Sequence, residues 1–162
     1  MKKKFFLYLV CVLSICLLGC GQEKGMKNTD NLKKVVKELF RPISDEEYQK
    51  FQNDSDTFSS SGWLSERFKD AMTEEAYNTF LETGTYQIML LSYENGGNIK
   101  IKKMEIEEKK DYDEFYVKLH ITSKNGDNEN LEVTGTAQFD DNGKVRYFTL
   151  NSMDKLAGML KK

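Results

Sequence analysis

Histidine is the residue type best suited to exchange protons near neutral pH, and His120 is the only histidine in the chain. A histidine that acts as a general base needs a carboxylate partner and a pocket. Apolar residues alternate along the strand predicted around His120, and this alternation places it on the polar face beside Lys118 and Thr122. We therefore predict an exposed strand residue, and we predict that the protein is not an enzyme.

Other groups that can serve a metal or a nucleophile occur in short clusters. Residues 125–129 carry oxygen ligands that calcium prefers, but they and residues 54–56 lack the ligand spacing of an EF-hand loop. The acidic pairs at 46–47 and 74–75 lie in the first turns of predicted helices, where carboxylates complement the helix dipole. The serines at 59–61 lack the sequence that surrounds a catalytic serine. We predict no catalytic residue, no metal site and no cofactor.

Aromatic side chains gather where the predicted helices give way to the predicted sheet. The group comprises Trp63, Tyr77, Phe80, Tyr86 and Tyr93. Such residues either fill the core or line an apolar pocket between helices and sheet. The candidate residues for a ligand pocket are Trp63, Tyr77 and Tyr86.

Two aromatic residues of the predicted strands are candidates for a contact surface. If Tyr116 and Phe148 lie on the outer face of the sheet, they mark a surface for a partner protein or for a second copy in a weak homodimer.

The first twenty residues predict export. Residues 2–4 are lysines, and residues 5–18 form an apolar run. As a helix this run reaches about 21 Å, which is short of the roughly 30 Å hydrocarbon core of a bilayer. A basic start, a short apolar run and polar residues from Gln22 onward are typical of a secretory signal peptide, which we place at residues 1–19. The alternative is an uncleaved single-pass anchor.

The end of this run, Leu17-Leu18-Gly19-Cys20, resembles the bacterial lipobox. Leu18 departs from the family pattern, which more often has Ala or Ser at that position. The resemblance implies transfer of a diacylglyceryl group to the Cys20 thiol and cleavage after Gly19. Two or three acyl chains attach a protein to a membrane stably, whereas a single chain does not. The implied product is a lipoprotein held through Cys20 on the extracytoplasmic face of the cell membrane.

Charge and cysteine content exclude several classes of protein. The chain has 24 basic and 26 acidic side chains, and residues 1–19 contain three of the bases and no acid. A nucleic-acid-binding protein needs a basic stripe that displaces counterions from phosphates, so we predict no nucleic-acid partner. Cys11 and Cys16 lie in the discarded run and Cys20 carries lipid, which leaves no thiol for a disulfide.

Beyond the signal, the sequence predicts a tether and one domain. Residues 20–31 are polar and lack an apolar period, which predicts a flexible tether. Apolar residues recur at helical spacing over 32–40, and Pro42 ends that helix. A capping box at residues 44–47 begins the next one. That helix is predicted to carry Tyr48 and Phe51 inward. Two more short helices are predicted, one over 63–72 and one that opens at Thr73 and ends near Gly84.

From Tyr86 the apolar period changes. The run at 86–93 is short and apolar, and it can be a strand. Ile99 and Ile101 share one parity while Met104 and Ile106 share the other, which predicts a β-bulge near residues 102–103. Strands with clearer patterns follow at 115–121, 131–139 and 145–150, with a turn at 140–143 and a terminal helix at 152–160. The gaps between strands are too short for parallel crossovers, so we predict an antiparallel meander and the α+β class.

This order of elements resembles the nuclear-transport-factor-like (cystatin-like) roll over residues 30–151. The stretch 68–77, with Phe80 and Leu81, is similar to the helical segment of small roll-fold lipoproteins and conjugation-apparatus proteins from Gram-positive bacteria. The resemblance implies an α+β roll domain at 32–162, in which short N-terminal helices pack on one face of a curved antiparallel β-meander of four to five strands. That fold hosts enzymes, ligand carriers and scaffolds, so it does not assign an activity.

We therefore predict a lipid-anchored extracytoplasmic protein that acts without catalysis through contacts with an envelope protein, as an accessory of an envelope or conjugation machine. The alternative is an exported protein that binds a small ligand in a pocket between helices and sheet.

Overall fold

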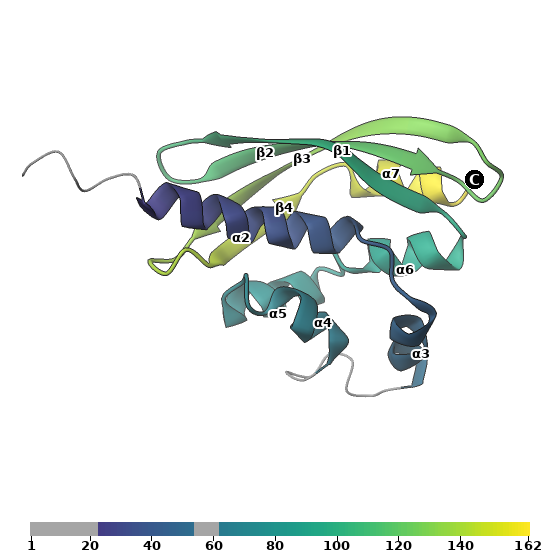
Figure 1. The fold of residues 1–162 in the computed structure, drawn as a ribbon, viewed down its shortest axis with the longest axis horizontal. Helices are drawn as coiled ribbons and strands as arrows, with labels where there is room; N and C mark the ends of the chain where they lie inside the picture. The colour runs from purple at the N-terminus through teal and green to yellow at the C-terminus, as the bar shows by residue number, and fades with distance from the viewer. Residues whose placement is uncertain (1–22, 54–61) are drawn as a thin grey trace, which may run out of the picture.

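The computed structural model describes residues 23–53 and 62–162 and confirms the α+β class. In the described part, five helices precede a four-stranded antiparallel sheet and one helix follows it. Figure 1 shows the helices gathered below one face of the curved sheet, with α2, α6 and α7 next to it and α3 and α4 farther away. We name this helix-covered side the inner face. No described element covers the opposite, outer face.

Helix α2 spans Glu23–Phe40 and lies along the inner face of the sheet (Figure 1). The predicted apolar stripe is buried throughout: Leu32, Val35, Val36, Leu39 and Phe40. The helix starts earlier than predicted, since residues 23–31, assigned to the flexible tether, are helical. Asn31 Nδ2 donates to the Gly143 carbonyl at 2.7 Å, which fixes this part of the helix to the β3–β4 turn. Extending a helix that is already docked costs less free energy than nucleating a new one, so polar residues can continue it. Their polarity alone therefore did not predict that residues 23–31 are helical.

Helices α4 (Trp63–Phe68) and α5 (Glu74–Glu82) come after residues 54–61, which lie outside the described part of the chain. Thr73 caps α5, because its Oγ1 accepts a hydrogen bond from the Ala76 amide at 3.2 Å. Phe68 is fully buried, and its ring packs on that of Phe80 with centroids 4.7 Å apart. These two helices are stable because they cover the apolar side of α2 and the start of β4.

Helix α3 (Asp45–Asn53) is attached differently, because none of its residues is buried. The predicted capping box is confirmed: Glu47 N donates to Ser44 Oγ at 3.2 Å, and Ser44 N donates to Glu47 Oε2 at 2.8 Å. Tyr48, predicted to face inward, is half-buried and stacks on Tyr93 with centroids 4.4 Å apart. The Tyr93 hydroxyl donates to Asp45 Oδ1 at 2.8 Å. Polar and aromatic contacts therefore hold α3 against α6.

The run at 86–93 is not a strand but helix α6, Gln87–Glu94. Its consecutive residues 88–90 are all buried, because α6 contacts α2, α7 and β1 on different sides. A helix buried on several sides shows no period in its sequence. Gly84 and Gly96, with φ of 69° and 61°, form the turns before and after it.

The sheet has the order β1-β2-β3-β4, and every neighbouring pair is antiparallel. Its strands are β1 (Asn98–Glu108), β2 (Asp113–Thr122), β3 (Asn128–Phe139) and β4 (Val145–Leu150). The β1–β2 register shifts between Ile101 and Lys103, which confirms the predicted bulge. In the β3–β4 turn, Asp140 Oδ1 accepts from the Lys144 amide at 2.7 Å, and Gly143 has φ 76°. Helix α7 (Met153–Leu160) then returns to the inner face.

Alternation along the strands separates the two faces. The inner positions of β2 are all buried, as predicted: Phe115, Val117, Leu119 and Ile121. Phe148 lies on this inner face, because its ring stacks on Phe115 with centroids 5.5 Å apart. It therefore does not belong to an outer contact surface. Tyr116 and Tyr147, which alternate with these two residues, lie on the outer face.

Candidate functional site

His120 lies on the outer face, as its parity predicted, but it is half-buried rather than exposed. Its Nδ1 is 3.1 Å from Asn130 Oδ1, so the imidazole is hydrogen-bonded to an amide rather than to a carboxylate. Residues 125–127 lie in the β2–β3 turn and residues 128–129 begin β3, where Asn128 Oδ1 accepts from Thr122 Oγ1 at 2.9 Å. Within residues 23–53 and 62–162, no three or more His, Cys, Asp or Glu side chains are grouped to hold a metal ion. Cys20 and the clusters at 54–56 and 59–61 lie outside the described residues.

A buried arginine joins α2, α3 and α4. The Arg67 side chain is 4 % exposed, and its Nη2 donates to both carboxylate oxygens of Glu47 at 2.7 Å. Its Nη1 donates to the carbonyl groups of Glu38 and Arg41 at 3.3 and 3.4 Å. The guanidinium carbon also lies 5.1 Å from the centre of the Trp63 ring, within cation–π distance. We name Glu38, Arg41, Glu47 and Arg67 the Arg67 cluster.

Glu47 is ionised in this cluster. Burial on its own raises the pKa of Glu47, but hydrogen bonds from Arg67 and Ser44 and the charges of Arg67 and Arg41 outweigh burial and lower it. Sequence reasoning identified Glu47 only as a cap and missed Arg67, whose partner lies 20 residues away. The available signal was that Arg67 follows Trp63 and Leu64 at helical spacing on a buried stripe.

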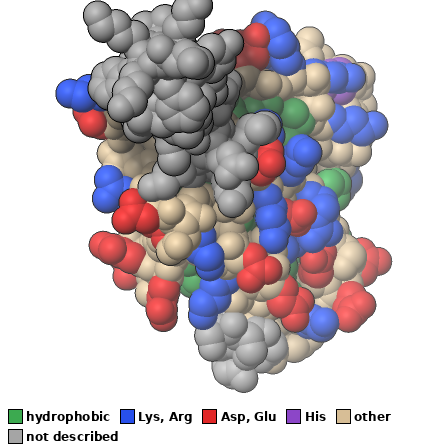
Figure 2. Space-filling model, turned by 60° about the vertical axis from the view of Figure 1, so that its left-hand side comes forward, with side chains coloured by type: hydrophobic (Ala, Val, Ile, Leu, Met, Phe, Trp, Pro, Cys, Tyr) green, Lys and Arg blue, Asp and Glu red, His purple; other side chains and the backbone are tan. Residues whose placement is uncertain are grey.

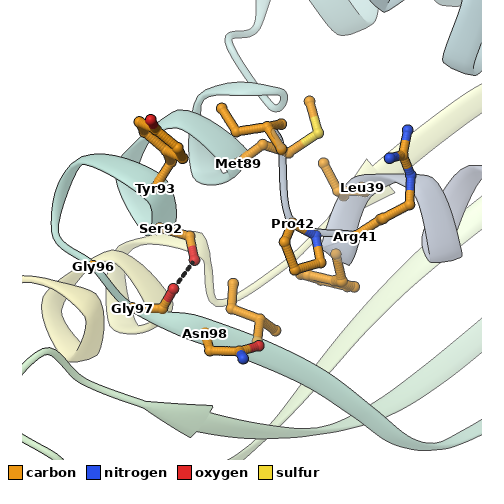
Figure 3. Close-up of a pocket in the computed structure, with 12 residues that line it drawn as sticks. Leu39, Arg41, Pro42, Met89, Ser92, Tyr93, Gly96, Gly97 and Asn98 are labelled. Carbon is orange, nitrogen blue, oxygen red and sulfur yellow. Dashed lines mark hydrogen bonds between the residues drawn. The ribbon is translucent and has the colours of Figure 1, made fainter. Parts of the chain in front are cut away.

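A pocket of about 270 Å³ lies between the end of α2, α6 and the start of β1, and we name it the Ser92 pocket (Figure 3). The Ser92 hydroxyl donates to the Gly97 carbonyl at 3.1 Å, the contact drawn in Figure 3. Arg41 is the charged residue among the described lining residues, and Glu38 holds its Nε at 2.7 Å. The Ser92 pocket is therefore a small hollow with a mixed polar and apolar lining, and its charged group is already paired.

A larger groove of about 740 Å³ lies between α6, α7 and the end of β4, and we name it the α6–α7 groove. Of the three predicted pocket residues, Tyr86 lines it, whereas Trp63 and Tyr77 line neither this groove nor the Ser92 pocket. Trp63 and Tyr77 are 6 % and 3 % exposed, and their N–H and O–H groups have no hydrogen-bond partner among the described residues. Burial raises the pKa of Tyr77. These two aromatics are core residues.

Tyr147 lies on the outer face near the end of the sheet at the β1–β2 turn, and Tyr112 lies in that turn. Tyr147 and Tyr112 are 48 % and 39 % exposed and are the exposed large hydrophobic side chains of the described residues. Gln138 connects them, because it pairs with Tyr147 in the sheet and lines one shallow hollow together with Tyr112. Tyr116 lies on the same face and donates to Glu114 Oε2 at 3.0 Å, which raises the pKa of Tyr116. We name Tyr112, Tyr116 and Tyr147 the tyrosine patch.

Charges on the surface are mixed. Figure 2 shows Lys and Arg side chains interspersed with Asp and Glu over the face presented, with small areas of hydrophobic side chain between them. Charged side chains of the described residues form pairs, including Lys103 with Glu105 at 2.6 Å and Lys118 with Glu132 at 3.8 Å. In the face of Figure 2, basic side chains are not gathered into a single stripe.

No protein-family model matches the chain, and no curated protein is significantly similar to it. Among residues 23–53 and 62–162, every helix is too short or too polar to cross a bilayer.

Proposed function

We propose that this chain is a lipid-anchored protein of the extracytoplasmic face of a bacterial membrane, which acts without catalysis through contacts with an envelope protein. The tyrosine patch is the observation that supports this most directly. Tyrosine is enriched at protein interfaces because its ring buries a large apolar area while its hydroxyl keeps a hydrogen bond. Tyr116 and Tyr147 lie on a sheet face that no described helix covers, and Tyr112 is exposed in the adjoining turn, so a partner reaches the patch without rearrangement of the fold.

The surroundings of the patch also suit a protein partner. Cross-strand hydroxyls such as Thr136 and Thr149, whose oxygens are 2.8 Å apart, make the outer face polar beside the tyrosines. Interfaces outside obligate complexes are about as polar as the rest of a protein surface, with aromatic residues near the centre. The partner in this proposal is a component of an envelope or conjugation machine, as the resemblance of residues 68–77 to roll-fold lipoproteins and conjugation-apparatus proteins implies.

Photo-crosslinking in cells tests this proposal. A photoreactive phenylalanine analogue replaces Tyr147 in the full chain, and the control carries it at Gln49, an exposed position on α3. We expect a discrete adduct from position 147 that weakens when Tyr112 is changed to alanine, and none from position 49. No adduct at 147, or equal adducts at both positions, would contradict a specific contact through the outer face.

Membrane attachment has its own test. Cells expressing the chain receive a labelled fatty acid, and we expect label on the native chain and none on Cys20→Ala. Ser14→Ala, another small substitution in the leader segment, is the matched control and is expected to keep the label. Label on the Cys20 variant would show that a different residue is modified.

A second candidate function is the binding of a small ligand. The α6–α7 groove favours it, because a hollow of about 740 Å³, lined by Tyr86 and by both apolar and polar side chains, has the size of a small-molecule site.

A further inference from the structure

The α6–α7 groove brings apolar side chains from four elements together in one hollow, beside the polar side chains of its ends. Six of its lining side chains are apolar and only half-buried: Phe51, Leu91, Phe148, Leu150, Met153 and Ala157. They come from α3, α6, β4 and α7, so the surface is continuous in space although it is scattered in sequence. A concave site that combines apolar side chains with a few polar groups is the usual form of a small-molecule site. The body of a ligand in this groove is therefore apolar.

The groove has two different ends. Gly97, just after α6, lies against α7, because a Cβ on it would be 2.8 Å from Leu160 Cδ2. The C-terminal ends of α6 and α7 are therefore neighbours, which places Glu94 and Lys161 together at one end of the groove. Asp154, in the first turn of α7, lies toward the other end. A molecule lying along the two helices is elongated.

The two ends differ in charge. Glu94 and Lys161 have opposite charges, and Glu94 Oε1 also accepts a hydrogen bond from the Tyr48 hydroxyl at 3.0 Å. At the other end Asp154 is the charged residue among the described lining residues, and no described cation forms an ion pair with it. Gln87 of α6 adds an amide near this end. The uncompensated carboxylate of Asp154 attracts a positively charged group.

We infer that the α6–α7 groove binds an elongated amphiphile whose apolar body lies along α6 and α7 and whose amine head contacts Asp154. The inference deepens the second candidate function and rests on it. Attachment to a membrane through Cys20 would keep the groove near a source of amphiphiles. The site is distinct from the tyrosine patch, since it lies on the inner, helix-covered side of the sheet.

Photoaffinity labelling of the full chain in its own membranes tests the inference. The probe is a long-chain alkylamine that carries a diazirine and an alkyne, and the comparison probe is the fatty acid of the same length with the same groups. Ala157→Phe fills the groove. Gly158→Phe is the matched control, because nothing lies within 4 Å of a Cβ at that position. Equal thermal unfolding of the two variants establishes that both are folded.

We expect the amine probe to label peptides of α6, α7 and β4, and Ala157→Phe to reduce this labelling about tenfold relative to Gly158→Phe. The amine should label more strongly than the acid by about two- to fivefold, and Asp154→Asn should remove that preference. Labelling elsewhere in the chain, or equal labelling of the two phenylalanine variants, overturns the groove as the site. An unchanged preference in Asp154→Asn overturns the head-group assignment and leaves Asp154 as an acid of the first turn of α7. A crosslink from Tyr147 that persists in Ala157→Phe shows that the outer-face contact does not depend on the groove, so the two proposals can fail independently.

Discussion

Replacing Glu47 with glutamine removes the charge that neutralises the buried guanidinium of Arg67. The change keeps the length of the side chain, and a glutamine still accepts the Ser44 amide hydrogen bond of the capping box. Glu47→Gln therefore isolates the ion pair from the helix cap. Arg67 would remain 4 % exposed, with carbonyl groups as its main partners.

The expected loss of stability follows from the burial of the two groups. Removing one partner of a fully buried ion pair costs about 3–5 kcal/mol, because the other charge is left uncompensated. The Glu47 side chain keeps 20 % of its exposure and solvent screens part of the pair, so we expect about 2 kcal/mol here. A domain of this size is stable by only about 5–15 kcal/mol, which makes such a loss easy to measure.

The same pair predicts a pH dependence with a definite sign. The pKa of Glu47 is lower in the folded chain than in an ordinary glutamate, so the carboxylate stabilises the fold at neutral pH. This contribution begins to fall when the pH drops below the ordinary glutamate pKa, and it is lost through the lower pKa of the folded state. Glutamine does not titrate, so the difference in unfolding free energy between wild type and Glu47→Gln should shrink at acid pH.

Urea unfolding followed by tryptophan fluorescence measures both effects, because Trp63 is the single tryptophan and packs on Arg67. The matched control is Glu46→Gln, whose exposed carboxylate pairs with Lys50 at 2.9 Å and should leave stability almost unchanged. Equal losses in the Glu46 and Glu47 variants, or a Glu47 loss that persists undiminished at acid pH, would refute the importance of the buried pair.

Two further predictions concern the sheet. Gly135→Ala should destabilise the fold by about 2–3 kcal/mol and lower the melting temperature, because a Cβ there would overlap the Phe115 ring and the Thr149 carbonyl. An unchanged melting temperature would mean that β3 and β4 move apart easily. Asp140→Ala should cost about 1–2 kcal/mol in urea unfolding, because its carboxylate accepts from the Asn142 and Lys144 amides, whereas the neighbouring Asp141→Ala should have little effect.

Much of the fold could be predicted because its signals are local. The stripe at 32–40, the capping box at 44–47 and the strand alternation at 115–121 are each encoded in adjacent residues. The β-bulge near 102–103 was visible for the same reason, as a change of parity within one strand. The α+β class followed from short gaps between strands, which left an antiparallel meander as the arrangement.

The errors have physical causes too. Helix α6 was ambiguous because residues 88–90 are all buried, and a helix enclosed on several sides loses its amphipathic pattern. Residues 23–31 were assigned to a tether because polarity hides a helix that a docked neighbour extends. Arg67 was missed because its partner lies in another helix, and long-range ion pairs leave no local pattern. The grooves were likewise unpredictable, since the α6–α7 groove combines residues of α3, α6, β4 and α7.

The position of the apolar surface separates the two binding proposals. The sheet uses its inner face to bury the core, and the helices that cover it leave the α6–α7 groove at their junction with β4. The outer face needs no apolar residue for folding, because it contacts no described element, yet it exposes Tyr147 more fully than any other large hydrophobic side chain in the described part. Folding therefore explains the aromatics of the inner face but not Tyr147. If the outer face binds a partner, Tyr147→Ala should abolish the contact while leaving the free energy of urea unfolding unchanged. A variant that loses stability instead would show that Tyr147 is exposed for a structural reason and not for binding.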